Sequence, residues 1–193
     1  MTTIYAVNDW IGADMNHAQY LNKPRFEEQK LAFSKLDCVI LAIGGWSRTA
    51  ARVHTIATYF EIMLLAQCFG FDDILAKAKT KIIDDAVNDT VIGLYKRDGR
   101  VITFCFEDER FDIEFRSDGV GYGTGLLCAK AEYHRQAILD EFCMDTIMEK
   151  TARLDPQTSE SFHTYHGDGL TDLESIEVKK FKEIVEEYLG EKL

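Results

Sequence analysis

Short apolar runs separated by turn-forming residues mark the first 45 residues as β-structure. The runs are rich in β-branched and aromatic side chains, which are typical of strands. Asn8 and Asp9 form a turn signal between the first two runs, and this hairpin would return Asp14 to the start of the chain. The fourth run is almost wholly apolar, which indicates a strand covered on both faces. The predicted strands are residues 3–7, 10–15, 29–33 and 38–43.

After Gly45 the apolar spacing changes to that of a helix. From about residue 47 to 68 one face carries apolar side chains, namely Val53, Ile56, Ala57, Phe60, Leu64 and Cys68. Gly70 is a stop signal, and Asp72 or Asp73 can cap a second helix that runs to about residue 86. Neither segment contains proline, so two uninterrupted helices are predicted.

The second half of the chain repeats this order of strands followed by helices. Residues 90–95, 100–106 and 110–115 predict a meander, with Asp98-Gly99 as one turn. Helices follow at 126–141 and 144–153, then a strand at 161–165 and an amphipathic acidic helix at 176–189. This order predicts an α+β fold, a four-layer αββα sandwich of two antiparallel sheets between helical layers.

Charge and composition exclude several classes of partner. The chain has 193 residues and a formal net charge of −11, whereas a nucleic-acid footprint needs clustered Lys and Arg. No apolar run approaches the roughly 18 residues of a membrane span. Asp9 and Asp14 argue against a secretory signal, so we expect a cytoplasmic protein that binds neither nucleic acid nor membrane. The cysteines are scattered singly, which predicts reduced, buried thiols.

Two further motifs suggest binding sites but are explained more simply by packing. The glycine-rich segment 119–125 is similar to a dinucleotide or phosphate loop, yet no βαβ unit surrounds it and no Walker lysine follows. A close backbone approach at the start of a helix is the favoured interpretation. His163 and His166 would point to opposite faces of a strand, so they would not share a metal ion. We therefore expect neither a metal nor a cofactor.

The start of the chain carries candidate nucleophilic chemistry. Met1 precedes the small residue Thr2, a context in which the initiator Met is normally removed. Removal would leave a hydroxyl nucleophile and an α-amine base on one residue. The α-amine titrates near 7.7–8.0, roughly at working pH, which suits proton transfer in both directions. An ordinary processed N-terminus is the alternative interpretation.

Several motifs occur in the order and spacing of one enzyme family. They are Thr2-Thr3-Ile4, Gly12-Ala13-Asp14, Lys30, Ala42-Ile43-Gly44-Gly45, Gly119-Val120-Gly121-Tyr122-Gly123 and Asp155-x-x-Thr158. Together they resemble the proteasome β-subunit family of N-terminal nucleophile hydrolases, and in particular the ATP-dependent protease subunit of the HslV type. The resemblance covers about residues 2–170 and includes the family's interval between its structural Asp and its catalytic Lys. It implies a proteasome-like domain over 1–170, with 171–193 as an acidic helical extension of the same domain.

The resemblance also implies roles for individual residues. Thr2 would attack the scissile carbonyl, with its own α-amine relaying the proton. Lys30 would lie buried beside Thr2, and Asp14 would pair with Lys30 and fix it. The Gly44 N–H would donate to the tetrahedral oxyanion. The alternative interpretation is an ordinary surface ion pair and a simple turn.

The remaining motif residues would organise the α-amine. By the resemblance, Asp155 and Thr158 would hold it through hydrogen bonds. Tyr122 stands where the family has a serine between two glycines, and that serine helps to organise the amine and a water molecule. Tyrosine keeps a hydroxyl but is much larger, so it would either narrow the site or point elsewhere.

The function implied by this resemblance is that of a threonine peptidase subunit. It would hydrolyse unfolded polypeptides inside a homo-oligomeric ring. Since the chain carries no Walker motif, a separate ATP-driven unfoldase would deliver the substrates. Two alternatives are a catalytically inactive proteasome-like assembly protein and an N-terminal nucleophile amidase that acts on a small molecule.

Overall fold

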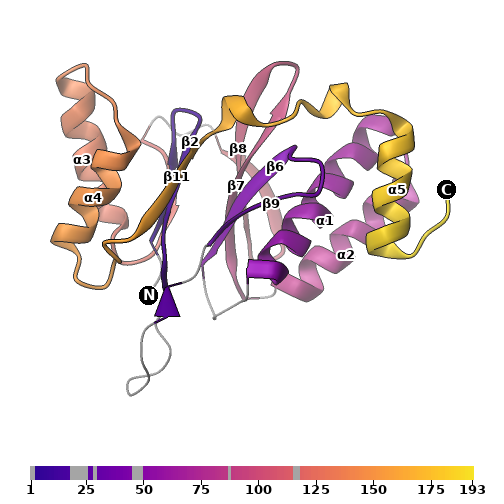
Figure 1. Cartoon of the computed structure of the whole chain (residues 1–193), viewed down its shortest axis with the longest axis horizontal. Helices are drawn as coiled ribbons and strands as arrows, with labels where there is room; N and C mark the ends of the chain where they lie inside the picture. Colours follow the sequence, from indigo (N-terminus) through magenta and orange to yellow (C-terminus); the bar gives the residue numbers. More distant parts are fainter. Residues whose placement is uncertain (1–2, 18–25, 28–29, 45–49, 87, 115–117) are drawn as a thin grey trace.

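The computed structural model describes residues 3–17, 26–27, 30–44, 50–86, 88–114 and 118–193. Their elements stack in four layers, with a helical pair, two β-sheets face to face and a second group of helices (Figure 1). The two main sheets are antiparallel between their named strands. The predicted α+β sandwich is therefore confirmed.

The first sheet places two strands from the start of the chain beside two strands from its second half. Its strand order is β10-β1-β2-β11. Asn8 and Asp9 both take positive φ, 48° and 64°, as a tight two-residue hairpin turn requires. This turn fixes the register of the hairpin and so determines which residue of the second strand lies beside the first. The strands are β1 (Ile4–Val7), β2 (Trp10–Asp14), β10 (Val120–Tyr122) and β11 (Phe162–His166).

The second sheet has the order β5-β6-β7-β8-β9, a meander of hairpins as predicted. A separate pair of two-residue strands, β3 (Asn16–His17) and β4 (Phe26–Glu27), lies in the connection before it. Segments this short carry no readable hydrophobic period, so the sequence did not predict them. The five strands are β5 (Leu31–Phe33), β6 (Val39–Gly44), β7 (Thr90–Arg97), β8 (Arg100–Glu107) and β9 (Arg110–Glu114).

The helices form the two outer layers (Figure 1). On the first sheet lie α3 (Leu126–Ile138) and α4 (Met144–Leu154). On the second lie α1 (Ala50–Phe69) and α2 (Asp72–Ala86). After the short turns η1 (Gly167–Gly169) and η2 (Leu173–Ser175), the acidic helix α5 (Val178–Leu189) packs its buried face against α1 and α2 of the same chain. None of the helices in the described ranges is long and apolar enough to cross a membrane.

Strand β6 shows how the sequence pattern builds the layers. Its side chains alternate between the helical layer, which receives Val39 and Leu41, and the space between the sheets, which receives Ile40 and Ala42. All its residues are buried. The continuous apolar run in the sequence thus reflects two buried faces, as predicted.

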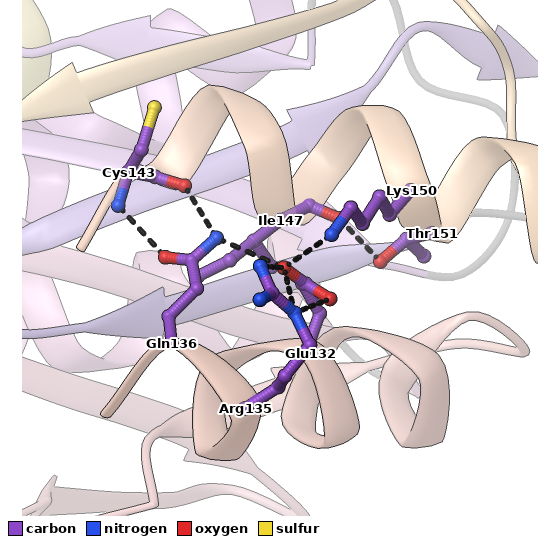
Figure 2. Close-up of polar contacts among 7 residues, drawn as sticks. All are labelled: Glu132, Arg135, Gln136, Cys143, Ile147, Lys150 and Thr151. Carbon is purple, nitrogen blue, oxygen red and sulfur yellow. Dashed lines mark hydrogen bonds and ion pairs between the residues drawn. The ribbon is translucent and has the colours of Figure 1, made fainter. Parts of the chain in front are cut away.

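A hydrogen-bonded cluster around Glu132 ties α3 to α4 (Figure 2). The buried Glu132 carboxylate accepts from Arg135 at 2.6 Å and from Lys150 of α4 at 2.9 Å. These donors, Arg135 first, outweigh the effect of desolvation and lower the pKa of Glu132 to about 2. Gln136 accepts from the Cys143 N–H at 2.8 Å and so caps the start of α4.

Three details differ from the sequence interpretation. Strand β10 lies inside the glycine-rich segment, because its three residues pair with β1 and have no period of their own. Asp72 and Asp73 occupy the first turn of α2, where their negative charges interact favourably with the helix dipole. All five cysteines are free thiols, but only Cys38 is buried, since the other four lie on partly or fully exposed faces.

Candidate active site

A buried carboxylate, Asp14, lies at the centre of the candidate site. One oxygen, Oδ1, accepts from the Thr3 N–H at 2.8 Å and from Lys30 Nζ at 2.7 Å. The other accepts from the Ser159 N–H at 3.1 Å. The exposed fraction is 0% for the Asp14 side chain and 2% for Lys30, so the pair is withdrawn from water. Charge-assisted bonds of this kind are the strong ones in proteins.

The Lys30 ammonium is held in an environment that disfavours its charge. Burial lowers its pKa, and the attraction of Asp14 opposes this effect without cancelling it. A lysine perturbed by desolvation next to a specific charge partner is a typical feature of a functional site. The predicted Asp14–Lys30 pair is therefore present in the structure and buried, and the surface-pair alternative is wrong.

The β1–β2 hairpin places Asp14 beside the beginning of β1. Ile4 pairs with Ala13, and the Asp14 N–H donates to the Thr3 carbonyl at 3.0 Å. On the other side of β2, Asp14 pairs with Phe162 of β11. Asp14 therefore lies between two strands, and its side chain has little freedom to leave Thr3.

A second set of hydrogen bonds leads from Thr3 to Asp155. The Thr3 and Thr158 hydroxyls lie 2.7 Å apart, and Thr158 Oγ1 donates to Asp155 Oδ2 at 2.7 Å. Because the Thr158 proton is used in that bond, Thr3 donates its own proton to Thr158. The Gly125 N–H donates to Thr3 Oγ1 at 3.2 Å. The Thr3 hydroxyl is thus fully engaged in holding the site together.

Asp155 fixes the direction of this chain of hydroxyls. Burial alone would raise its pKa, but bonds from Thr124, Thr158 and the Gln157 N–H outweigh burial and lower it. An ionised Asp155 is an acceptor only, so both threonine hydroxyls must point toward it. Asp155 and Thr158, which the resemblance assigns to one site, are hydrogen-bonded to each other, and Thr158 in turn bonds Thr3.

Gly44 and Tyr122 meet at the same end of the space between the sheets. A Cβ added to Gly44 would lie only 2.2 Å from Tyr122 Cδ1 and 2.5 Å from Cε1, so the ring packs directly on the glycine. Tyr122 pairs with Ile4 of β1, and Leu31, the residue after Lys30, pairs with Ala42 of β6. These registers bring Gly44 and Tyr122 to the strand ends that also carry Thr3 and Lys30.

The structure thus gathers most of the residues named by the sequence motifs. Thr2 and Gly45 lie outside the described residues. The sequence interpretation missed four contributors, which are Thr3, Thr124, Gly125 and Ser159. The predicted close approach at the glycine-rich segment is observed at Gly125, where an added Cβ would lie 2.6 Å from Thr158 Oγ1 and 2.7 Å from Thr3 Oγ1. Gly125, a residue without a side chain at the start of α3, was the sequence signal that could have indicated this contact with Thr3.

Solved structures with the same fold include HslV and Anbu. Eukaryotic HslV from Trypanosoma brucei is 13% identical with a TM-score of 0.56, and the match covers 86% of this chain and 98% of that one. The Gly-1 mutant of Anbu from Hyphomicrobium sp. strain MC1 is 11% identical with a TM-score of 0.57, covering 98% and 93%. Anbu from Pseudomonas aeruginosa, solved as a helical assembly, is 12% identical with a TM-score of 0.51, covering 89% and 83%. No protein-family model and no curated protein matches the sequence significantly.

Proposed function

We propose that this chain is a proteasome-like threonine peptidase subunit whose nucleophile is Thr2 after removal of Met1. The observation that carries the proposal is the buried Asp14 carboxylate, which bonds both Lys30 and the backbone of Thr3. Through this carboxylate the lysine with the lowered pKa is linked to the residue that directly follows the nucleophile. Burying an ammonium carries a desolvation penalty, so its placement at this strand end supports a functional role.

The proposed reaction is acyl transfer to Thr2. Its hydroxyl proton passes to its own α-amine while Oγ bonds to the scissile carbonyl carbon. The Gly44 N–H donates to the oxyanion, a contact that typically contributes about 2.7–4 kcal/mol. The C–N bond then breaks and the leaving nitrogen takes the proton from the ammonium. Water hydrolyses the remaining ester, with the amine as base, and restores Thr2.

The other residues set the conditions for this reaction. The Lys30 cation favours the developing negative charge on the threonine oxygen, and Asp14 keeps that cation in place. Asp155 and Thr158 would hold the α-amine, and the hydrogen bonds from Thr3 to Thr158 and from Thr158 to Asp155 keep both residues beside the start of the chain. A donor and acceptor set fixed in advance in this way is what electrostatic catalysis requires.

The proposed substrates are unfolded polypeptides, and the proposed working form is a homo-oligomeric ring in the cytoplasm. The fold shared with HslV and Anbu supports this, as does the helical assembly of one Anbu protein. A separate ATP-driven unfoldase would supply the substrate. We propose residues 1–170 as the peptidase domain, with 171–193 as its acidic helical extension.

The test is peptide hydrolysis by protein that lacks Met1. We expect Thr2→Ala to lower kcat by about a thousandfold or more, since removal of a nucleophile leaves only residual catalysis. Thr80→Ala is the matched control, because Thr80 is exposed on α2 and donates to the Ala76 carbonyl of its own helix. Equal rates in the parent and Thr2→Ala would contradict the proposal.

A catalytically inactive assembly protein is the second candidate. The observation that favours it is the Tyr122 ring, which covers the glycine proposed as oxyanion donor. The mass of the N-terminus of the purified protein separates the two functions. Loss of Met1 supports the peptidase, whereas full retention leaves Thr2 with an amide in place of a base and supports the assembly role.

A further inference from the structure

The ring of Tyr122 occupies space next to the proposed oxyanion donor. Cδ1, Cε1 and Cγ of the ring lie 2.2, 2.5 and 2.9 Å from the position of a Cβ on Gly44. These atoms form the near edge of a rigid ring, so a short side-chain movement cannot clear them. The ring thus fills the volume that a side chain at position 44 would take.

Strand pairing positions the Tyr122 backbone, and apolar packing positions its ring. Tyr122 pairs with Ile4 across β10 and β1, and its side chain packs on the apolar cluster between the sheets. Rotation away from Gly44 would have to expose this apolar contact to water. The half-buried ring therefore forms a wall of the space beside Gly44.

This wall lies close to any substrate that uses Gly44. An oxyanion donor holds the carbonyl oxygen at about 2.7–3.1 Å. The Cα on the carbonyl side of the scissile bond is about 2.4 Å from that oxygen, as bond lengths require. The side chain on this Cα therefore starts close to Gly44 and has to extend away from it. The Tyr122 ring already fills part of the space around Gly44.

We infer that Tyr122 is a specificity-determining residue that restricts the carbonyl side of the scissile bond to small residues such as glycine, alanine and serine. The inference rests on the proposed peptidase function. The reaction is unchanged, and only the group attached to the attacked carbonyl is limited in size. A residue with a large apolar or aromatic side chain at that position would meet the ring.

The first experiment compares kcat/KM for two fluorogenic peptides that differ only in alanine or phenylalanine before the scissile bond. We expect the parent to prefer alanine and Tyr122→Ala to raise the phenylalanine-to-alanine ratio by about ten- to a hundredfold, a range typical of pocket size changes. Tyr122→Phe keeps the ring and should keep the parent ratio. Tyr122→Leu retains apolar packing and replaces Tyr122→Ala in the comparison if the alanine variant does not fold.

The second experiment tests the ring contact without catalysis. Gly44→Ala should lower the urea midpoint of unfolding in the parent, because its methyl group would overlap the ring. In the Tyr122→Ala protein the same substitution should leave the midpoint unchanged. Equal losses in both backgrounds would show that the ring does not contact Gly44 and would overturn the inference.

The outcomes separate the inference from the proposed function. Hydrolysis by the parent with an unchanged ratio in Tyr122→Ala overturns the size limit and leaves the peptidase in place. Equal gains in kcat/KM on the two peptides in Tyr122→Ala also overturn the size limit. Hydrolysis that survives Thr2→Ala, or that is absent from every variant, overturns the peptidase and with it the size limit, while the double-mutant result still decides whether the ring packs on Gly44.

Discussion

Two of the carboxylate–lysine pairs among the described residues differ in how far they are withdrawn from water, since both partners are buried in one and only the carboxylate is buried in the other. In the site, Lys30 is 2% exposed and bonds Asp14 at 2.7 Å. Between α3 and α4, Glu132 is 8% exposed, while its partner Lys150 is 39% exposed. The bond lengths are nearly equal, so the difference between the clusters lies in their surroundings.

The surroundings give the two clusters opposite electrostatic character. Burial destabilises the Lys30 cation and lowers its pKa. Around Glu132, hydrogen bonds from Arg135 and Lys150 stabilise the anion and lower its pKa to about 2. The site keeps the Lys30 cation where burial disfavours its charge, whereas the cluster between α3 and α4 surrounds the Glu132 anion with hydrogen-bond donors. The first arrangement is typical of functional sites and the second of structural ties.

The largest effect is expected from removing the buried carboxylate of the site. Asp14→Asn takes the negative charge away from the buried Lys30, and such a change typically costs about 3–5 kcal/mol. Urea unfolding at neutral pH measures the loss. Combining Asp14→Asn with Lys30→Met should be less harmful than Asp14→Asn alone, because the buried ammonium is then absent while the asparagine can still accept from a backbone N–H. A loss below about 1 kcal/mol for Asp14→Asn would mean that the pair is not buried as described.

A smaller loss is expected at the structural cluster. Glu132→Gln removes the acceptor charge shared by Arg135 and Lys150 and should lower the free energy of unfolding by about 2 kcal/mol, the usual range for bonds to a charged group. Glu149→Gln, at the exposed pair with Arg153, is the matched control and should cost less than about 0.5 kcal/mol.

The contribution of Glu132 to the free energy of unfolding should also depend on pH. Its folded pKa of about 2 lies below its ordinary value of 4.5, so the folded state binds fewer protons than the unfolded state between these values. The stabilisation is complete above pH 4.5 and is lost as the pH falls toward 2. The difference in unfolding free energy between the parent and Glu132→Gln should therefore shrink over this interval. A difference that stays constant with pH would contradict the assignment.

The smallest effect is expected from the neutral member of the same cluster. Gln136→Ala removes the acceptor for the Cys143 N–H at the start of α4 and should cost about 1 kcal/mol, as loss of a helix cap does. Gln67→Ala, an exposed position on α1, is the control. Thermal unfolding followed by circular dichroism measures both. Equal effects would show that Gln136 does not act as a cap.

The amino-acid sequence was enough to predict the long strands and helices and the Asp14–Lys30 pair of the site. Strands and helices were readable because each long element imposes its own period on apolar residues, as β6 and α5 do. The Asp14–Lys30 pair, and the assignment of Asp155 and Thr158 to one site, were implied by the resemblance, whose motifs keep a fixed interval along the chain. These features are local, or are carried over by the resemblance.

Which distant residues meet at one point depends on how the layers pack together. Strand β10 exists because β1 offers it an edge, and Thr3 is central because Asp14, Gly125 and Thr158 converge on it from three separate segments. The sequence likewise left open the direction of the Tyr122 ring, which in the structure packs on Gly44. Such contacts join residues far apart along the chain, so no local period or spacing records them, and only the packing of the layers fixes them.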